Sequence, residues 1–532
     1  MTVQTPHRDS PICKEVIIAG AGFGGLCMAI QLKEQGKNNF FILEKSHDVG
    51  GTWRDNSYPG CACDVQSHMY SFSFSPNNHW SKRYAPWHEI QQYLLETTAK
   101  YDIRKHCQFH QEVVSAVFNE NIGEWVIKTH TGIIYHCKHF ILASGPLHVP
   151  EIPNIKGLKN FQGKVFHSAQ WDHDYDLTGK NVASIGTGGS AIQYCPEIAP
   201  KVNQLDVFQR TPAWVLPRDD RKYWRVEKTA FKHIPGWRKL HRYRLYWTNE
   251  ARVWPIFNPS LAKSLSMLAK GLIRFQVKDK VTASRLTPNY TIGCKRILIS
   301  NKYYPMFNRK NVELVTEGIK EIKENSIITA DGKERAVDCI ILGTGFVVDP
   351  RIYMRDFELK GLEGRDLRTD WKDCAEAYYG TSVAGYPNLW MLIGPNSGLG
   401  HNSIIFMIEA QVKYILNCMK AIEHRQSDYM TVKEDAQLQF NTHLQKLMKQ
   451  TVWSTGCKSW YQQEDGRNIA VWPKSTWKFW LETLNIKVSD YVFTQLGQSQ
   501  EQRKDQHRNR VSETKSKMKR NKENTEVATE LT

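Results

Sequence analysis

Two glycine-rich turns in this chain have the residue types and spacing that hold the phosphates of a dinucleotide. The first follows an apolar run at residues 15–19 and the second follows a similar run at residues 181–185. Glycine permits the tight turn and lets the backbone approach a pyrophosphate, which lies against the N-terminus of the next helix. Two such turns predict two bound dinucleotides. The residues predicted to bind them are Gly20, Gly22 and Gly25 at the first turn, and Gly186, Thr187, Gly188, Gly189, Ser190 and Ala191 at the second.

The residue that ends the second strand of each unit distinguishes the two ligands. Glu44 and Arg210 each lie 24 positions after the first glycine of their turn, and their charges are opposite. A carboxylate accepts hydrogen bonds from ribose hydroxyls and repels a 2′-phosphate, whereas a guanidinium binds that phosphate through bonds worth roughly 1.5–3 kcal/mol. The second site is therefore predicted to bind NADP, with Thr211 adding a hydroxyl. The alternatives are a solvated strand-end carboxylate for Glu44 and a surface salt bridge for Arg210.

The first site suits either FAD or NAD on this argument, and the residues that follow it favour FAD. A flavin needs a long, aromatic-lined slot with backbone donors near its ring, and an NAD dehydrogenase does not need a second nucleotide. The alternation of Tyr70, Phe72 and Phe74 is typical of a half-buried strand. The residues predicted to complete the FAD site are Thr52, Trp53, Asp64 and Tyr70.

The order of apolar runs predicts an α/β fold with two dinucleotide-binding, Rossmann-like domains. Runs at 140–142 and 339–342 are expected to be return strands that close each unit. The region 216–290 is rich in Trp, Tyr, Arg and Lys at helical spacing, which predicts an inserted helical subdomain, with a membrane-surface helix as the alternative. The expected divisions are an FAD-binding domain (1–145 and 344–495), an NADP-binding domain (146–215 and 291–343), the helical subdomain (216–290) and a disordered basic tail (496–532).

Composition narrows the class of protein. The formal charge is +17, and nine Lys and Arg against six Asp and Glu in residues 497–532 leave most of that charge on the body of the chain. Phosphate-bearing cofactors account for part of it. No nucleic-acid module, no CxxC motif and no run of 18 apolar residues is present. We therefore expect a cytoplasmic protein in a reducing compartment, with no nucleic-acid partner and no stable membrane insertion, and leave peripheral membrane association and the oligomeric state open.

Two longer motifs resemble one enzyme family. Residues 161–172 read FxGxxxHxxxWD, and residues 50–64 read GGxWxxxxYPGxxxD. With further matches near residues 293–296, 394–403 and 465–468, the chain resembles the single-chain Baeyer–Villiger monooxygenases from about Val16 to Tyr491. Many members have an arginine where Ala62 stands, so contacts near Asp64 carry over less directly.

The resemblance implies a reaction and its residues. NADPH would reduce FAD, O2 would form a C4a-peroxyflavin, and this would insert one oxygen atom next to the carbonyl of a small ketone, giving an ester or lactone. Arg296 is the expected catalytic cation, Asp64 orients it, and Lys295 and Arg296 border the NADP site. We expect His167 to fix backbone geometry rather than act as a base, and Trp171 to pack a hinge.

Three other functions are weighed against this one. An N- or S-oxygenating flavin monooxygenase has a similar short motif but lacks the ending Trp171-Asp172. A disulfide reductase needs a paired redox-cysteine motif, which this sequence lacks. A non-catalytic flavin sensor would signal through the basic tail. Substrate choice is expected to depend on loops at 370–405 and 450–475.

Overall fold

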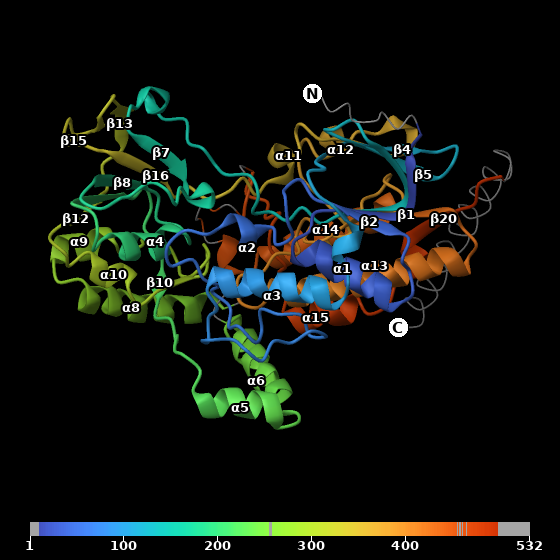
Figure 1. Ribbon diagram of the computed structural model, residues 1–532, viewed down its shortest axis with the longest axis horizontal. Helices are drawn as coiled ribbons and strands as arrows, with labels where there is room; N and C mark the ends of the chain where they lie inside the picture. The colour runs from blue at the N-terminus through green and yellow to red at the C-terminus, as the bar shows by residue number, and fades with distance from the viewer. Residues whose placement is uncertain are drawn as a thin grey trace, which may run out of the picture.

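The protein consists of two α/β units side by side, with helices α5 (Arg225–His233) and α6 (Trp237–Ala251) projecting beneath them (Figure 1). The predicted fold class, with two Rossmann-like units, is confirmed. The predicted tail lies outside the described residues from position 498 onward. The computed structural model describes residues 10–254, 258–454, 456, 459, 461–463 and 465–497.

The first unit is built on an eight-stranded sheet and the second on a five-stranded parallel sheet beside a small antiparallel one. The strands of the first sheet are β1 (Ile12–Ala19), β2 (Phe40–Leu43), β3 (Cys107–Gln108), β4 (Val113–Asn119), β5 (Glu124–Thr129), β6 (Ile134–Leu142), β17 (Glu358–Lys360) and β18 (Leu389–Met391). The strands of the second unit are β7 (Lys164–His167), β8 (Asn181–Ile185), β9 (Gln204–Phe208), β12 (Val312–Val315) and β16 (Cys339–Leu342), with β13 (Ile319–Ile322), β14 (Ser326–Thr329) and β15 (Glu334–Ala336) in the antiparallel sheet. Two short pairs are β10 (Val215–Leu216) with β11 (Leu298–Ile299), and β19 (Tyr429–Val432) with β20 (Tyr491–Thr494).

Helices surround both sheets. The remaining helices are α1 (Phe23–Glu34), α2 (Thr52–Asp55), α3 (Trp87–Lys100), α4 (Ala191–Ile198), α8 (Pro259–Gln276), α9 (Lys280–Arg285), α10 (Tyr303–Met306), α11 (Pro350–Tyr353), α12 (Leu367–Asp370), α13 (Ile404–His424), α14 (Glu434–Met448) and α15 (Thr476–Glu482). No helix within the described residues is both long enough and apolar enough to cross a membrane.

Each nucleotide turn follows a central parallel strand, as its apolar pattern requires. In the first sheet β1 lies between β6 and β2, and Val16, Ile17 and Ile18 are buried because layers cover both faces. Helix α1 begins at the glycine turn and packs against α13. In the second sheet β8 lies between β16 and β9, in the order β12-β9-β8-β16-β7. Both turns therefore open at the carboxyl ends of their sheets, where ligands of such folds bind.

Two local expectations differ from the structure. The alternation at Tyr70, Phe72 and Phe74 forms no strand; these residues lie in turns and bends, where the Phe72 backbone N–H donates to the Tyr93 hydroxyl at 2.9 Å. We also expected the short motif to be a linker between the two turns, but its Lys164–His167 segment is β7 at the edge of the second sheet, paired with β16.

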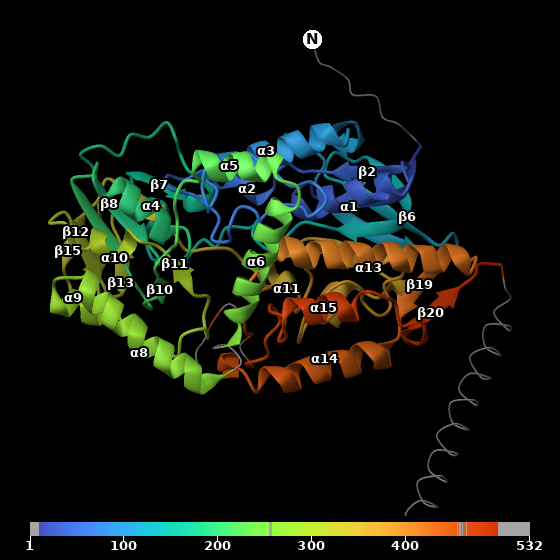
Figure 2. The same ribbon diagram turned by 90° about the horizontal axis from the view of Figure 1, so that it is seen from below.

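The predicted helical region is helical, but it divides in two. Helices α8 and α9 lie on the second unit, and α8 contacts α10. Helices α5 and α6 instead project beneath the molecule, and Figure 2 shows α6 crossing the underside between α8 and α15. A helix interior is stabilised mainly by the surface it buries, so the way α6 is attached decides how firmly the projection is held.

The inner end of α6 is attached through a buried carboxylate. Glu250 accepts hydrogen bonds from the Asn402 amide at 2.7 Å and from the Thr476 hydroxyl at 2.5 Å, and His401 Nε2 lies 3.3 Å away. Burial raises the pKa of Glu250, but hydrogen bonds from these three residues outweigh burial and the net pKa is lowered. The preceding Asn249 exchanges two amide hydrogen bonds with Gln66. One turn of α6 thus joins the loop after Asp64 to the loop at 401–402.

Replacing Glu250 by Gln should destabilise the protein at neutral pH. A neutral amide cannot accept all of these bonds, and a lost charge-assisted bond costs about 2 kcal/mol. Because folding lowers the pKa of Glu250, the stabilising effect is present above the unfolded pKa of about 4.3 and is lost as pH falls through the folded value. We expect a lower melting temperature for Glu250→Gln than for the wild type, with a difference that shrinks in acid, measured by thermal denaturation across pH.

The matched control is Glu34→Gln, since Glu34 is an exposed carboxylate at the end of α1. Its melting temperature should follow that of the wild type at every pH. A Glu250→Gln variant as stable as the wild type at neutral pH would contradict the role given to this carboxylate.

Candidate active site

The first glycine turn has no room for side chains at two of its glycines. Gly20 has a φ of +107°, and a Cβ there would lie 2.7 Å from the Ala143 carbonyl oxygen. A Cβ on Gly25 would lie only 1.9 Å from the Gly20 carbonyl oxygen, so α1 can begin this close to β1 only without a side chain. Gly22 is followed by the first turn of α1, whose free N–H groups suit a pyrophosphate.

Glu44 is buried rather than solvated at its strand end. Its two carboxylate oxygens accept hydrogen bonds from the backbone N–H groups of Ala21 and Ser46, each at 2.9 Å, and Arg54 lies 3.3 Å away. The bond to Ala21 fixes the middle of the glycine turn. The carboxylate therefore also shapes the turn, which the sequence did not indicate.

The surroundings of this turn fit FAD. A Cβ on Gly51 would lie 3.2 Å from the Cα of Gly22, so the backbone before α2 packs closely against the first glycine turn. Trp53 donates a hydrogen bond from its indole N–H to the Tyr70 hydroxyl at 3.1 Å, and their rings contact edge to face. Thr52 begins α2 beside them. The predicted FAD residues are thus brought together.

The second turn repeats the same geometry. Gly186 has a φ of +112°, and a Cβ there would lie 2.3 Å from the Gly343 carbonyl oxygen. The space around Gly188 is open, since a Cβ added at this residue would meet no heavy atom within 4 Å. The buried Ala191 begins α4, and Thr187 donates from its hydroxyl to the Thr211 carbonyl at 3.3 Å. The N-terminus of α4 therefore faces an accessible glycine backbone, which suits a pyrophosphate.

Two cations lie together near this turn. Burial lowers the pKa of Lys295, and repulsion from Arg210 lowers it further. The Lys295 ammonium also lies 5.0 Å from the centre of the Tyr290 ring. Arg210 is exposed and has no ion-pair partner among the residues that the structure describes. Two like charges held this close suit an anion with a double negative charge, such as the 2′-phosphate of NADP.

The residue after Lys295 contacts the first unit. An Arg296 guanidinium nitrogen lies 2.5 Å from an Asp64 carboxylate oxygen, and this carboxylate raises the pKa of Arg296 above its ordinary value. The Arg296 side chain remains 37% exposed, so it retains donors for another ligand. Tyr461 lies near this pair, and burial raises its pKa to about 12 although Arg296 opposes the shift. Tyr461 has no motif signal, so sequence reasoning missed it.

A contact between the units holds the Asp64 loop in place. The Gln193 side chain on α4 accepts from the Ala62 N–H and donates to the Ala62 carbonyl, both at 3.1 Å. Gly60 makes room for this approach, since a Cβ there would lie 2.8 Å from the Glu197 side chain. Position 62 therefore acts through its backbone, which any residue type other than proline supplies, and Gln193 was not predicted.

The short motif is structural in its contacts. His167 is buried, accepts a hydrogen bond from the Ala169 N–H at 3.1 Å, and has its pKa lowered by burial. Trp171 packs against Phe166 and Tyr194. The expectation that His167 fixes backbone geometry and that Trp171 packs a hinge stays a prediction.

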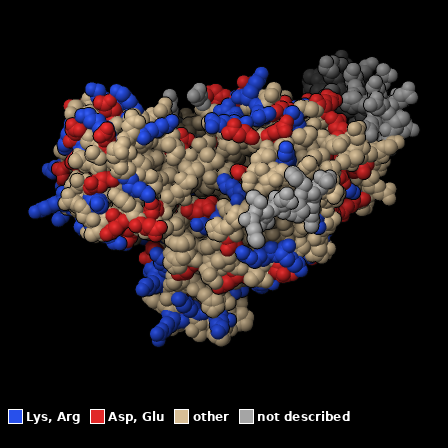
Figure 3. All heavy atoms as spheres, turned by 45° about the horizontal axis from the view of Figure 1, so that its top comes forward, with Lys and Arg blue, Asp and Glu red and all other residues tan. Residues whose placement is uncertain are grey.

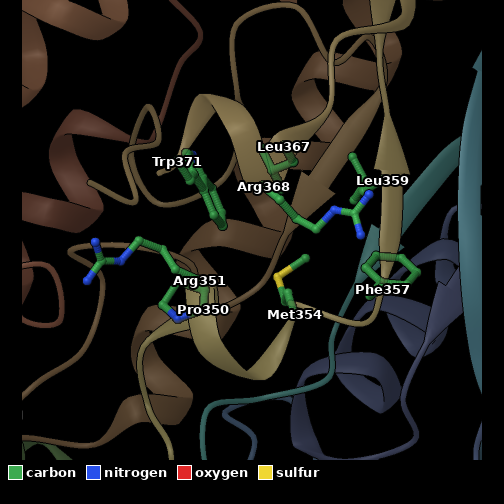
Figure 4. A pocket seen from close by; sticks show the side chains of 8 residues that line it. All are labelled: Pro350, Arg351, Met354, Phe357, Leu359, Leu367, Arg368 and Trp371. Atoms are coloured by element: carbon green, nitrogen blue, oxygen red, sulfur yellow. The ribbon is translucent and has the colours of Figure 1, made fainter. Parts of the chain in front are cut away.

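One small pocket is separate from these residues. Figure 4 shows it between α11, β17 and α12, with Met354 and Phe357 pointing inward. Its two guanidinium groups, on Arg351 and Arg368, are paired with Asp349 and Asp366. Its cavity volume of about 10 Å³ is far below that of a ligand site. It contains no predicted site residue, and we assign it no role.

Known proteins share both sequence and fold with this chain. Residues 17–234 match the family model described as pyridine nucleotide-disulphide oxidoreductase. The disulphide chemistry in that description needs paired redox cysteines, whereas Cys61 and Cys63 beside the first site are free thiols. The chain is 46% identical to a Baeyer–Villiger monooxygenase of Pseudomonas aeruginosa, over 93% of this chain and 94% of that protein. It is 42% identical to one of Streptomyces coelicolor, over 90% and 92%.

Solved structures agree with this. An oxidized steroid monooxygenase bound to NADP superposes with a TM-score of 0.82 at 27% identity, covering 91% of this chain and all of that one. Cyclohexanone monooxygenase from Rhodococcus sp. Phi1, bound to NADP+, has the same TM-score and coverage at 25% identity. The protein is a flavin-dependent monooxygenase with FAD and NADPH as cofactors. The chain therefore belongs to the family of Baeyer–Villiger monooxygenases.

Proposed function

We propose that this enzyme inserts one oxygen atom of O2 next to the carbonyl of a small-molecule ketone, giving an ester or lactone, while the other oxygen leaves as water and NADPH supplies the two electrons. Bound FAD supplies the oxygen-transfer chemistry through a C4a-peroxyflavin. The observation that supports the proposal is the Arg296–Asp64 pair, which joins a permanent cation of the second unit to a carboxylate of the first.

Arg296 is proposed to act through its charge. A guanidinium remains protonated in proteins, and a nearby cation favours the deprotonated form of an oxygen acid by Coulomb attraction. A deprotonated peroxide oxygen is the nucleophile that a ketone requires. The same guanidinium, which is partly exposed, is placed to donate to the oxyanion formed when the carbonyl is attacked. Asp64 accepts a hydrogen bond from one guanidinium nitrogen and so fixes the direction of the remaining N–H donors.

Lys295 and Arg296 are proposed to serve different cofactors. They are adjacent in sequence, yet Lys295 is close to Arg210 whereas Arg296 contacts Asp64. Lys295 and Arg210 would bind the 2′-phosphate of NADPH, while Glu44 would accept from the ribose of FAD. This arrangement supports NADPH as the reductant at the second turn and FAD at the first.

Arg296→Ala should uncouple the reaction. NADPH oxidation should continue, because Lys295 and Arg210 remain. The electrons should instead reduce O2 to hydrogen peroxide, and the rate of ester formation should fall by a factor of about 10²–10³. The measurement combines stopped-flow spectra of the flavin with chromatography of the products. Arg296→Lys should recover only part of the yield, because an ammonium lacks the planar set of donors with which a guanidinium can bond to Asp64 and to a second ligand at once.

The control is Arg355→Ala, which removes an arginine that is 73% exposed and pairs with the neighbouring Asp356, and it should leave ester yield unchanged. Wild-type ester yield from Arg296→Ala would overturn the role of this cation. Testing a cyclic ketone and a thioether side by side addresses the N- or S-oxygenating alternative, since an enzyme that oxidised only the thioether would contradict ketone oxygenation.

Removing either of the two cations proposed to bind the 2′-phosphate should weaken the binding of NADPH but not that of NADH. Arg210→Ala or Lys295→Ala should raise KM for NADPH by about 10- to 100-fold, equivalent to the roughly 1.5–3 kcal/mol of a charged hydrogen bond. KM for NADH should change little, because NADH has no 2′-phosphate. Steady-state NAD(P)H oxidation measures both values. The double variant should lose less than the product of the two effects, since both cations would bind one group.

Lys302→Ala is the matched control, as an exposed lysine on the same unit that pairs with Glu197. Equal losses for NADH and NADPH in Arg210→Ala would show a role in general binding and not in phosphate recognition.

A further inference from the structure

Most of the net charge of the chain lies in one segment. Residues 221–290 contain sixteen Lys and Arg but only three Asp and Glu, a formal +13 out of +17 for the whole chain. Figure 3 shows blue Lys and Arg side chains gathered over the lower projection, which consists of α5 and α6. The NADP site uses Arg210 and Lys295, which lie outside this segment. The charge here therefore has another cause.

The same projection exposes large apolar side chains. On α6, Trp237, Leu240, Tyr243 and Trp247 recur every three or four residues, so they share one helix face. All four are exposed, with Leu240 at 61% and Trp247 at 58%. The opposite face of α6 carries Arg242, Tyr246 and Asn249. Tyr246 and Asn249 are buried, and Arg242 donates to the carbonyls of His68 and Ser71 on the body of the protein. The apolar face of α6 therefore points away from the body of the protein.

Helix α5 extends this surface. Trp224 and Val226 at its start are 67% and 79% exposed. Contiguous exposed apolar surface of this kind is rare on soluble proteins and marks an interaction site. We call the exposed faces of α5 and α6 (residues 224–247) the basic arm.

The cations of the basic arm are not neutralised by neighbours. Arg225, Lys239 and Arg244 have no ion-pair partner among the described residues. Of the two acidic residues in α5 and α6, Glu227 is bonded to Arg221 and Glu250 is buried. An anionic partner would be attracted to these charges over about 8 Å at physiological salt.

We propose that the basic arm binds the surface of an anionic lipid bilayer. Its tryptophans and aliphatic side chains would enter the headgroup region while its lysines and arginines meet lipid phosphates, so that the helices lie on the membrane without crossing it. Nucleic acid fits less well, because Val226 and Leu240 cannot stack on bases or bond to phosphates. A second copy of this chain fits less well too, because two arms of like charge repel each other.

The test uses the full-length holoenzyme and vesicles. The holoenzyme should co-sediment with vesicles of phosphatidylcholine containing one quarter phosphatidylglycerol, and not with vesicles of phosphatidylcholine alone. Added salt should release it from the anionic vesicles. Acyl chains brominated near the headgroup should quench its tryptophan emission, a readout that needs no variant.

Leu240→Glu and Trp247→Glu should each reduce vesicle affinity at least tenfold. Ile122→Glu is the apolar control, since Ile122 is 45% exposed on the β4–β5 hairpin at the opposite side of the molecule in Figure 1. For charge, Lys239→Glu should weaken binding, whereas Lys128→Glu on the exposed side of β5 should not. Flavin content verifies that every variant is folded.

Four outcomes would overturn the proposal. These are no sedimentation with anionic vesicles, equal binding to neutral vesicles, equal losses in the control variants, and tighter binding to duplex DNA than to vesicles. A dimer that Leu240→Glu dissociates in the absence of lipid would assign the surface to a second copy instead.

Discussion

The contact between Arg296 and Asp64 is the interaction on which the rest of the arrangement depends. It joins residues 232 positions apart, one from each nucleotide-binding unit. Because a guanidinium stays charged throughout the physiological pH range, the fold has only to control where this cation lies. Repulsion from Arg210 lowers the pKa of Lys295, one residue earlier, so a single short segment interacts with groups of both units. The two sheets, the two turns and the contacts between units all serve to place that segment.

Much of the fold was predictable because buried parallel strands have an unmistakable pattern. The apolar runs predicted strands at 181–185 and 339–342, and β8 and β16 have those bounds. The glycine turns were predictable for a steric reason, since the required φ and the close carbonyl at Gly20 and Gly186 exclude a side chain. The alternation at Tyr70 to Phe74 was misleading, because rings that pack around Phe23 produce the same period as a strand.

What the sequence did not reveal is contacts between distant segments. Gln193 and Ala62 are 131 positions apart, and Glu250 bonds to a threonine 226 positions later. Neither pair leaves a periodic signal, because each depends on how two units or loops meet and not on a local backbone conformation. Tyr461 is hidden in the same way. The roles of the predicted cofactor and catalytic residues stay predictions, although the fold brings them together in two clusters.

The double hydrogen bond between Gln193 and Ala62 also bears on how such enzymes are engineered. Helix α4, which begins at the predicted NADP turn, is bonded to the backbone of the loop before Asp64 without using the side chain at position 62. The residue type at position 62 can therefore differ among relatives, whereas Gly60 and Gln193 lie where the two units contact each other. In chimaeras that exchange one nucleotide-binding unit between homologues, both partners of this double hydrogen bond would have to be kept so that the two units pack in the same way.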